Sequence, residues 1–128
     1  MSAAATLRAA VLARMRADVA VTRVFEDARA KGTVPFLTLR ELSAGDWGTK
    51  DRAGRDLRVG VAVRDEGESG ARCAGLAAQA EAALLALGRD IPGWRIVTVA
   101  PVRNALLAEG AGRWVALVDV RVRMMEEN

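Results

Sequence analysis

The chain has 128 residues, the size of a single domain, so we expect one domain over residues 1–128. It contains no histidine and one cysteine, Cys73, which excludes imidazole-based triads, histidine or paired-cysteine zinc sites and an intramolecular disulfide. Its 19 basic residues, nearly all arginine, exceed its 16 acidic ones and give a net charge of +3. Arginine suits phosphate, carboxylate and interface contacts, although it also reflects GC-rich coding.

The acidic residues are scattered along the chain, and the closest clusters lie at turn and tail positions (Asp65, Glu66 and Glu68; Glu126 and Glu127). Such positions do not suit paired-carboxylate catalysis or a magnesium site. The sequence therefore predicts a protein that is not an enzyme and has no cofactor or metal.

The N-terminal segment is rich in alanine but is interrupted by Arg8, Arg14 and Arg16 before any apolar core of a signal peptide forms. Since no apolar stretch reaches about 18 residues either, we expect a cytoplasmic protein without a membrane partner.

Leu7, Val11 and Met15 recur at four-residue spacing, which predicts a helix over residues 3–18. Short β-branched segments at residues 22–26 and 34–42 predict two strands. Residues 43–54 contain three glycines and no apolar periodicity and predict a loop. The alternation that follows, over residues 57–64, predicts a strand antiparallel to the one before the loop.

Ser69 is placed to cap a second helix, whose apolar positions recur every three or four residues until Leu87. Residues 94–102 and 113–124 read as strands joined by a glycine turn. The expected order is αβββαββ, an α+β fold with a single antiparallel or mixed sheet and two helices packed on one face.

Trp47 is a large aromatic in the predicted loop, among the charged residues Asp46, Lys50, Arg52 and Arg55. A loop aromatic without an apolar surround is costly to leave in water, which predicts a partner contact. The alternative is a tryptophan folded back on its own domain.

Arg121 and Arg123 face away from the valines of the last strand and could bind phosphate, or could simply face solvent. No helix concentrates groove-reading side chains and no strand pair carries stacking aromatics, so weak nonspecific nucleic-acid binding is the form that stays open. Cys73, among alanines on a helix, reads as a buried and inert thiol.

Several of these segments together resemble the small tail terminator, or tail completion, proteins of long-tailed phages and gene transfer agents. They are the N-terminal alanine-rich helix ending before Val24 and Phe25, the strand VPFLTL at 34–39, the polar loop to Gly54, the strand at 57–64, the helix at 74–87 and the strand at 114–124. The third strand lacks the aromatic that such proteins often carry near its end.

The resemblance implies a virion protein that forms a homo-oligomeric ring, usually a hexamer. Its partners would be the major tail tube protein, whose head-proximal end it caps, and the head-completion (stopper) protein, with DNA only as passing cargo. Another head–tail joining or minor tail protein, or a small nonspecific nucleic-acid-binding protein, are the alternatives. The interface residues expected on this reading are Asp46, Trp47, Lys50, Arg52, Arg55, Arg121 and Arg123.

Overall fold

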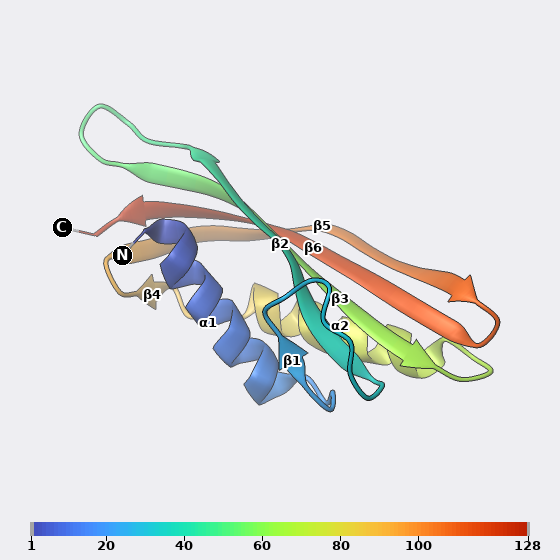
Figure 1. Ribbon diagram of the computed structural model, residues 1–128. Helices are drawn as coiled ribbons and strands as arrows, with labels where there is room; N and C mark the ends of the chain where they lie inside the picture. Colours follow the sequence, from blue (N-terminus) through green and yellow to red (C-terminus); the bar gives the residue numbers. More distant parts are fainter. Residues whose placement is uncertain (1, 128) are drawn as a thin grey trace.

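Two helices and six strands follow one another along the computed structural model, which describes residues 2–127 (Figure 1). In chain order they are α1 (Ala3–Asp18), β1 (Val24–Phe25), β2 (Phe36–Asp46), β3 (Gly54–Glu66), α2 (Ala71–Leu85), β4 (Asp90–Ile91), β5 (Trp94–Gly110) and β6 (Arg113–Glu126).

The strands form a single sheet in the order β1-β2-β3-β6-β5-β4. β1 pairs with β2 in parallel, and all other pairs are antiparallel, so the sheet is mixed. The predicted α+β class with one mixed sheet and the order αβββαββ is confirmed. The structure adds β4, a two-residue strand too short to carry a sequence pattern.

Both helices pack on one face of the sheet, and the residues between the layers form the core. Leu7, Val11 and Met15 of α1 are fully buried against the same cluster as Leu84 of α2. The sheet contributes every second residue, and on β6 these are Ala116, Val118, Val120, Val122 and Met124. The alternation read from the sequence therefore predicted the inward face correctly.

The four long strands extend further than the sequence predicted. Residues 43–54 were expected to form a loop, but β2 continues to Asp46 and β3 begins at Gly54. This part of β2 has no large apolar side chain, and its strand conformation is held by backbone pairing with β3, which continues to the pair Asp46 and Arg55. β5 likewise continues past residue 102 to Gly110, because it pairs with β6 along this length.

Polar groups at the helix starts satisfy backbone donors. The Ser2 hydroxyl caps α1 by accepting a hydrogen bond from the Ala5 amide at 3.1 Å. Ser69, the expected cap of α2, lies one residue before the N-cap Gly70, where its hydroxyl accepts from the Ala71 amide. Within residues 2–127 neither helix combines the length and hydropathy needed to cross a bilayer.

Candidate functional site: the hairpin end of the sheet

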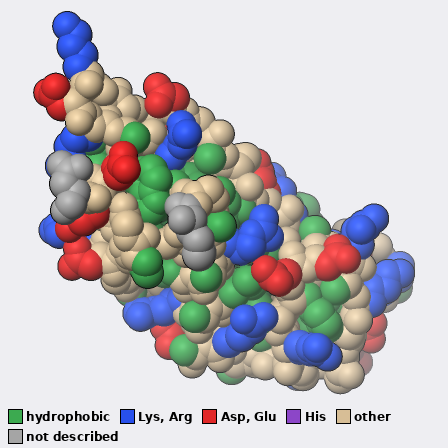
Figure 2. Space-filling model, turned by 60° about the vertical axis from the view of Figure 1, so that its left-hand side comes forward, with side chains coloured by type: hydrophobic (Ala, Val, Ile, Leu, Met, Phe, Trp, Pro, Cys, Tyr) green, Lys and Arg blue, Asp and Glu red, His purple; other side chains and the backbone are tan. Residues whose placement is uncertain are grey.

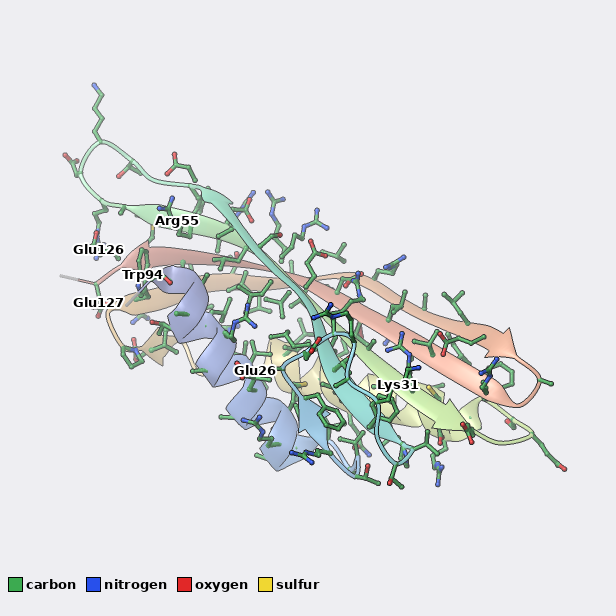
Figure 3. All side chains as sticks on the ribbon, viewed as in Figure 1. Glu26, Lys31, Arg55, Trp94, Glu126 and Glu127 are labelled. Carbon is green, nitrogen blue, oxygen red and sulfur yellow. The ribbon has the colours of Figure 1, made fainter. Side chains whose placement is uncertain are left out.

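The turn between β2 and β3 and the last residues of β6 meet at one end of the molecule, here called the hairpin end (residues 46–56 and 121–126). β3 pairs with β6 as far as Gly54 opposite Met125, which brings the turn beside the C-terminal strand. Figure 3 places Arg55 and Glu126 at this end, together with Trp94 at the start of β5. All seven residues predicted as a partner interface lie here.

Trp47 lies half-buried in the turn and contacts β6. The guanidinium carbon of Arg123 is 5.4 Å from the centre of the Trp47 ring, a cation–π contact. The Trp47 amide donates to the Gly54 carbonyl at 3.1 Å. A Cβ on Gly54 would lie 2.6 Å from the Trp47 carbonyl oxygen, so this close approach requires glycine. The ring rests partly on its own domain and keeps part of its surface accessible.

Three charged side chains flank Trp47. The Arg52 guanidinium donates to the Glu126 carbonyl at 3.0 Å and ties the turn to β6. Arg55 lies 3.7 Å from an Asp46 carboxylate oxygen across the β2–β3 pair, and both side chains are exposed. Exposed pairs of this kind contribute little to stability, which leaves these charges free to meet a partner.

Arg121 and Arg123 share one carboxylate. Arg121 binds Asp56 through two nitrogens, with its Nε donating at 2.8 Å, and the Nε of Arg123 lies 3.7 Å from the same group. The Arg121 hydrogen bonds, followed by the charges of both arginines, lower the pKa of Asp56 below its ordinary value. The two arginines are therefore held in place rather than extended freely into water.

A second arginine cluster lies at the centre of the helix-free face, the face of the sheet opposite the helices. Asp119 of β6 is buried and binds Arg40 of β2 on one side and Arg103 of β5, at 3.0 Å, on the other. A Cβ on Gly60 would lie 2.6 Å from an Arg40 nitrogen, so Gly60 makes room for this cluster.

Sequence reasoning placed Asp119 on this face but did not identify Arg40, Arg103 or Gly60 as its neighbours. A carboxylate between valines on a central strand was a signal that basic partners must exist. Which arginines supply them depends on the strand order, which brings β2 and β5 to either side of the β3–β6 pair.

Opposite charges alternate over the surface instead of gathering by sign. On the helix-free face Arg64 lies 3.5 Å from Glu109, in addition to the clusters at Asp56 and Asp119. Figure 2, which brings the end with the two termini toward the viewer, shows basic and acidic side chains interspersed with hydrophobic ones there. A phosphate backbone is best met by a continuous basic stripe, whereas these arginines of the helix-free face are paired with carboxylates.

Residues 2–127 contain no group of three or more acidic or cysteine side chains placed to hold a metal ion. A hollow of about 580 Å³ lies near the other end of the sheet, between the β1–β2 connection and the start of β6. Its charged lining mixes Arg29, Lys31 and Arg113 with Glu66 and Glu109.

Two buried polar side chains beneath α2 are structural. Asp65 accepts two hydrogen bonds from Arg72, which lower the pKa of this carboxyl group. The Cys73 thiol is buried, donates to the Val63 carbonyl at 3.4 Å, and has its pKa raised by burial. A buried thiol that resists ionisation is a poor nucleophile, in agreement with the inert cysteine predicted from the sequence.

Comparison with known proteins gives a match to a protein family and a match to a solved structure. The model of the family described as tail completion protein gp17 matches residues 9–125. A solved chain from the virion of a native gene transfer agent particle superposes with a TM-score of 0.81 at 22% identity, covering 98% of this chain and 99% of that one. At this identity the superposition establishes the shared fold. No curated protein matches the sequence.

Proposed function

Because the chain belongs to the tail completion protein gp17 family, we propose that it caps the head-proximal end of a tail tube as a homo-oligomeric ring, a hexamer, and joins that tube to the head-completion protein. Family membership makes it a structural component of a phage-type tail. The match over residues 9–125 is the observation that carries this proposal, because it begins within α1 and includes β2, β3, α2, β5 and all but the last residue of β6.

The hairpin end is the surface that we assign to docking. It combines an accessible aromatic, Trp47, with arginines at positions 52, 55 and 123, and these two residue types dominate binding energy at protein interfaces. The arginines at Asp56 are already ordered by their carboxylate, which reduces the entropy lost on binding. Either the tail tube or the head-completion protein is the partner that this surface would meet.

Deletion of the gene tests the function as a whole. A protein that caps the growing end of a tube and supplies the joint should, when absent, leave filled heads and separate tubes of irregular length. Electron microscopy of the particles measures both features. Normal numbers of joined particles with tails of uniform length would contradict the proposal.

A triple variant tests the hairpin end separately. Trp47→Ala combined with Arg52→Glu and Arg55→Glu should reproduce part of the joining defect while the protein stays folded, since none of these side chains lies in the core. At hot spots a single aromatic or arginine anchor is worth about 2 kcal/mol or more, so the number of joined particles should fall at least tenfold.

The matched control reverses two charges at another exposed site. Arg29→Glu with Lys31→Glu changes the β1–β2 connection, where Figure 3 places Lys31 well away from Arg55. This variant should assemble joined particles at the parental level. If the triple variant also does so, the docking surface lies elsewhere, although the ring function would still stand on the deletion result.

A further inference from the structure

Both edges of the sheet expose long stretches of strand without a neighbour among residues 2–127. β4 covers β5 at Trp94 and Arg95, and the Ile96 amide donates to the Arg89 carbonyl at 2.7 Å, which leaves the edge open from residue 97 to residue 110. β1 covers β2 only at Leu37 and Thr38, which leaves residues 39–46 open on the opposite edge. Unpaired backbone donors and acceptors on an edge strand are a template for pairing with another chain.

The β5 edge also carries exposed apolar side chains. Val97, Val102, Leu106 and Leu107 are 40–48% exposed and are the large hydrophobic residues left accessible among those described. All four belong to β5. An edge that is both unpaired and apolar promotes aggregation unless a defined partner covers it.

The two open edges are compatible in direction. The pairs β2–β3, β3–β6 and β6–β5 are all antiparallel, so β5 runs opposite to β2. A second copy, rotated about an axis along the strands, presents its β2 to β5 in the antiparallel sense. Each copy then uses one edge for one neighbour and the other edge for the next, the arrangement that closes into a ring.

Irregularities in both strands leave one matching length of regular strand. β5 has bulges at residues 96–98, 101–103 and 108–110, and Pro101 lacks an amide donor. The regular part between the last two bulges is residues 103–108. In β2 the bulge at residues 39–41 leaves residues 41–46 regular. Each edge therefore offers six regularly paired residues.

The side chains on these lengths also match. Leu106 and Leu42 lie on the helix-bearing side of their strands, opposite the fully buried Ala116 and Val59. Residues 41–46 contain two acids and no base, and residues 103–108 contain one base and no acid. We propose that the copies of the ring join by antiparallel pairing of β5 with β2 of the next copy, with Leu106 opposite Leu42.

This register places Ser43 opposite Ala105 of the neighbouring copy, both on the helix-free face. Directly opposed residues of an antiparallel pair have Cβ atoms about 5 Å apart. The proposal rests on the ring function above, and it specifies which two surfaces of the chain make the ring.

Cysteine cross-linking tests the pairing in purified particles. Ser43→Cys with Ala105→Cys in one chain, treated with a short bismaleimide, should give a ladder of covalent oligomers that ends at one largest species. Each single variant should stay monomeric, and so should the parental protein, whose Cys73 is buried. Dimers formed by Ala105→Cys alone would show β5 paired with β5 and would overturn the proposal. Only monomers from the double variant would also overturn it.

A second variant covers the case in which the double cysteine variant does not enter particles. Leu106→Lys should lower the amount of protein in particles at least tenfold, whereas Ala78→Lys, at an exposed position of α2, should not change it. Parental incorporation of Leu106→Lys would overturn edge pairing. If the parental protein itself is absent from particles, the proposed function fails, which is a separate outcome from failed pairing.

Discussion

The two faces of the sheet are built from the same strands but are stabilised by different interactions. On the helix-bearing face β3 and β6 present valines, leucines and Met124, which are fully buried beneath α1 and α2. On the other face the same strands present Asp56, Asp119 and Arg121 in ion pairs with neighbouring strands. Period-two alternation makes this division possible.

We expect the helix-bearing face to determine the stability of the fold and the helix-free face to contribute mainly to assembly with other chains. Apolar burial is the dominant favourable term in folding, so changes on the helix-bearing face should act on the free energy of unfolding. Exposed and half-exposed ion pairs contribute little, so changes on the helix-free face should act mainly on contacts with other chains. The cluster at Asp119 is the exception, because its charge is buried, so changes there should also lower the free energy of unfolding.

The largest effect is expected in the core between the layers. Leu57→Ala removes a fully buried side chain and should lower the free energy of unfolding by about 2–5 kcal/mol, through lost transfer energy and the cavity left behind. Urea denaturation followed by circular dichroism measures the change. The control Leu107→Ala, at an exposed edge position, should stay within about 0.5 kcal/mol of the parent.

A smaller loss is expected where the helix-free face buries charge. Gly60→Ala places a methyl group against the Arg40–Asp119 pair and should cost about 1–3 kcal/mol, because one of the two side chains must move. Thermal unfolding of the two proteins side by side would measure it. An unchanged melting temperature would mean that the Arg40–Asp119 contact can shift at no cost.

Acid should weaken the ion pair between β3 and α2. The pKa of Asp65 is lowered in the folded state by its hydrogen bonds with Arg72, so the folded protein holds this carboxylate charged more readily than the unfolded chain does. The resulting stabilisation is present above the unfolded pKa, near 3.8, and is lost as the pH falls through the folded value.

Asp65→Asn removes that contribution and should destabilise the protein by about 1 kcal/mol at pH 7. The difference in the free energy of unfolding between variant and parent should become smaller as the pH falls from 7 to 3, as measured by urea denaturation across this pH range. Asp51→Asn, in the exposed β2–β3 turn, serves as the control and should leave the pH dependence unchanged. A difference that stays constant with pH would show that Asp65 acts through packing instead of charge.

The smallest effect should be a gain. Gly75 lies in α2 at an exposed position, and a Cβ there would meet no atom within 4 Å. Gly75→Ala should stabilise the protein by about 0.5–1 kcal/mol, because alanine loses less backbone entropy in a helix. Thermal unfolding gives the comparison with Gly60→Ala. A loss of stability would indicate that a side chain at position 75 clashes with a neighbouring atom, contrary to the open space around Gly75.

Residues 43–54 are predicted from their composition to be mobile in the free subunit, but residues 43–46 pair with β3, so the prediction now applies to the turn at residues 47–53. Glycines and charged residues offer little local burial, so we expect this turn to be mobile in the free subunit and to become ordered in the particle. Hydrogen exchange measures this directly. The Trp47 amide donates to the Gly54 carbonyl, whereas the Gly48 amide donates only to the exposed Asp46 carboxylate at 3.3 Å, so strong protection of the Gly48 amide in the isolated subunit would contradict the prediction.

Local patterns in the sequence determined both helices, the inward face of β6 and the fold class, because burial imposes periods of 3.6 and 2 that a single segment displays. They also placed Trp47 and the arginines among the candidate contacts. The lengths of β2 and β5 could not be obtained in this way. Residues 43–46 and 103–110 carry no apolar alternation of their own and are held in the sheet by pairing with β3 and β6.

Only the tertiary structure decided which charged side chains meet and which edges stay open. Asp119 binds Arg103 of β5, the adjacent hairpin strand, and Arg40 of β2, which is distant in sequence and reaches Asp119 across β3 because the strand order is β2-β3-β6-β5. Among residues 2–127, the same order leaves one edge of β5 unpaired beyond Ile96 and one edge of β2 unpaired over residues 39–46. Pairing between strands is a long-range property: the sequence of a strand specifies its two faces, whereas its neighbours specify what lies along its edges.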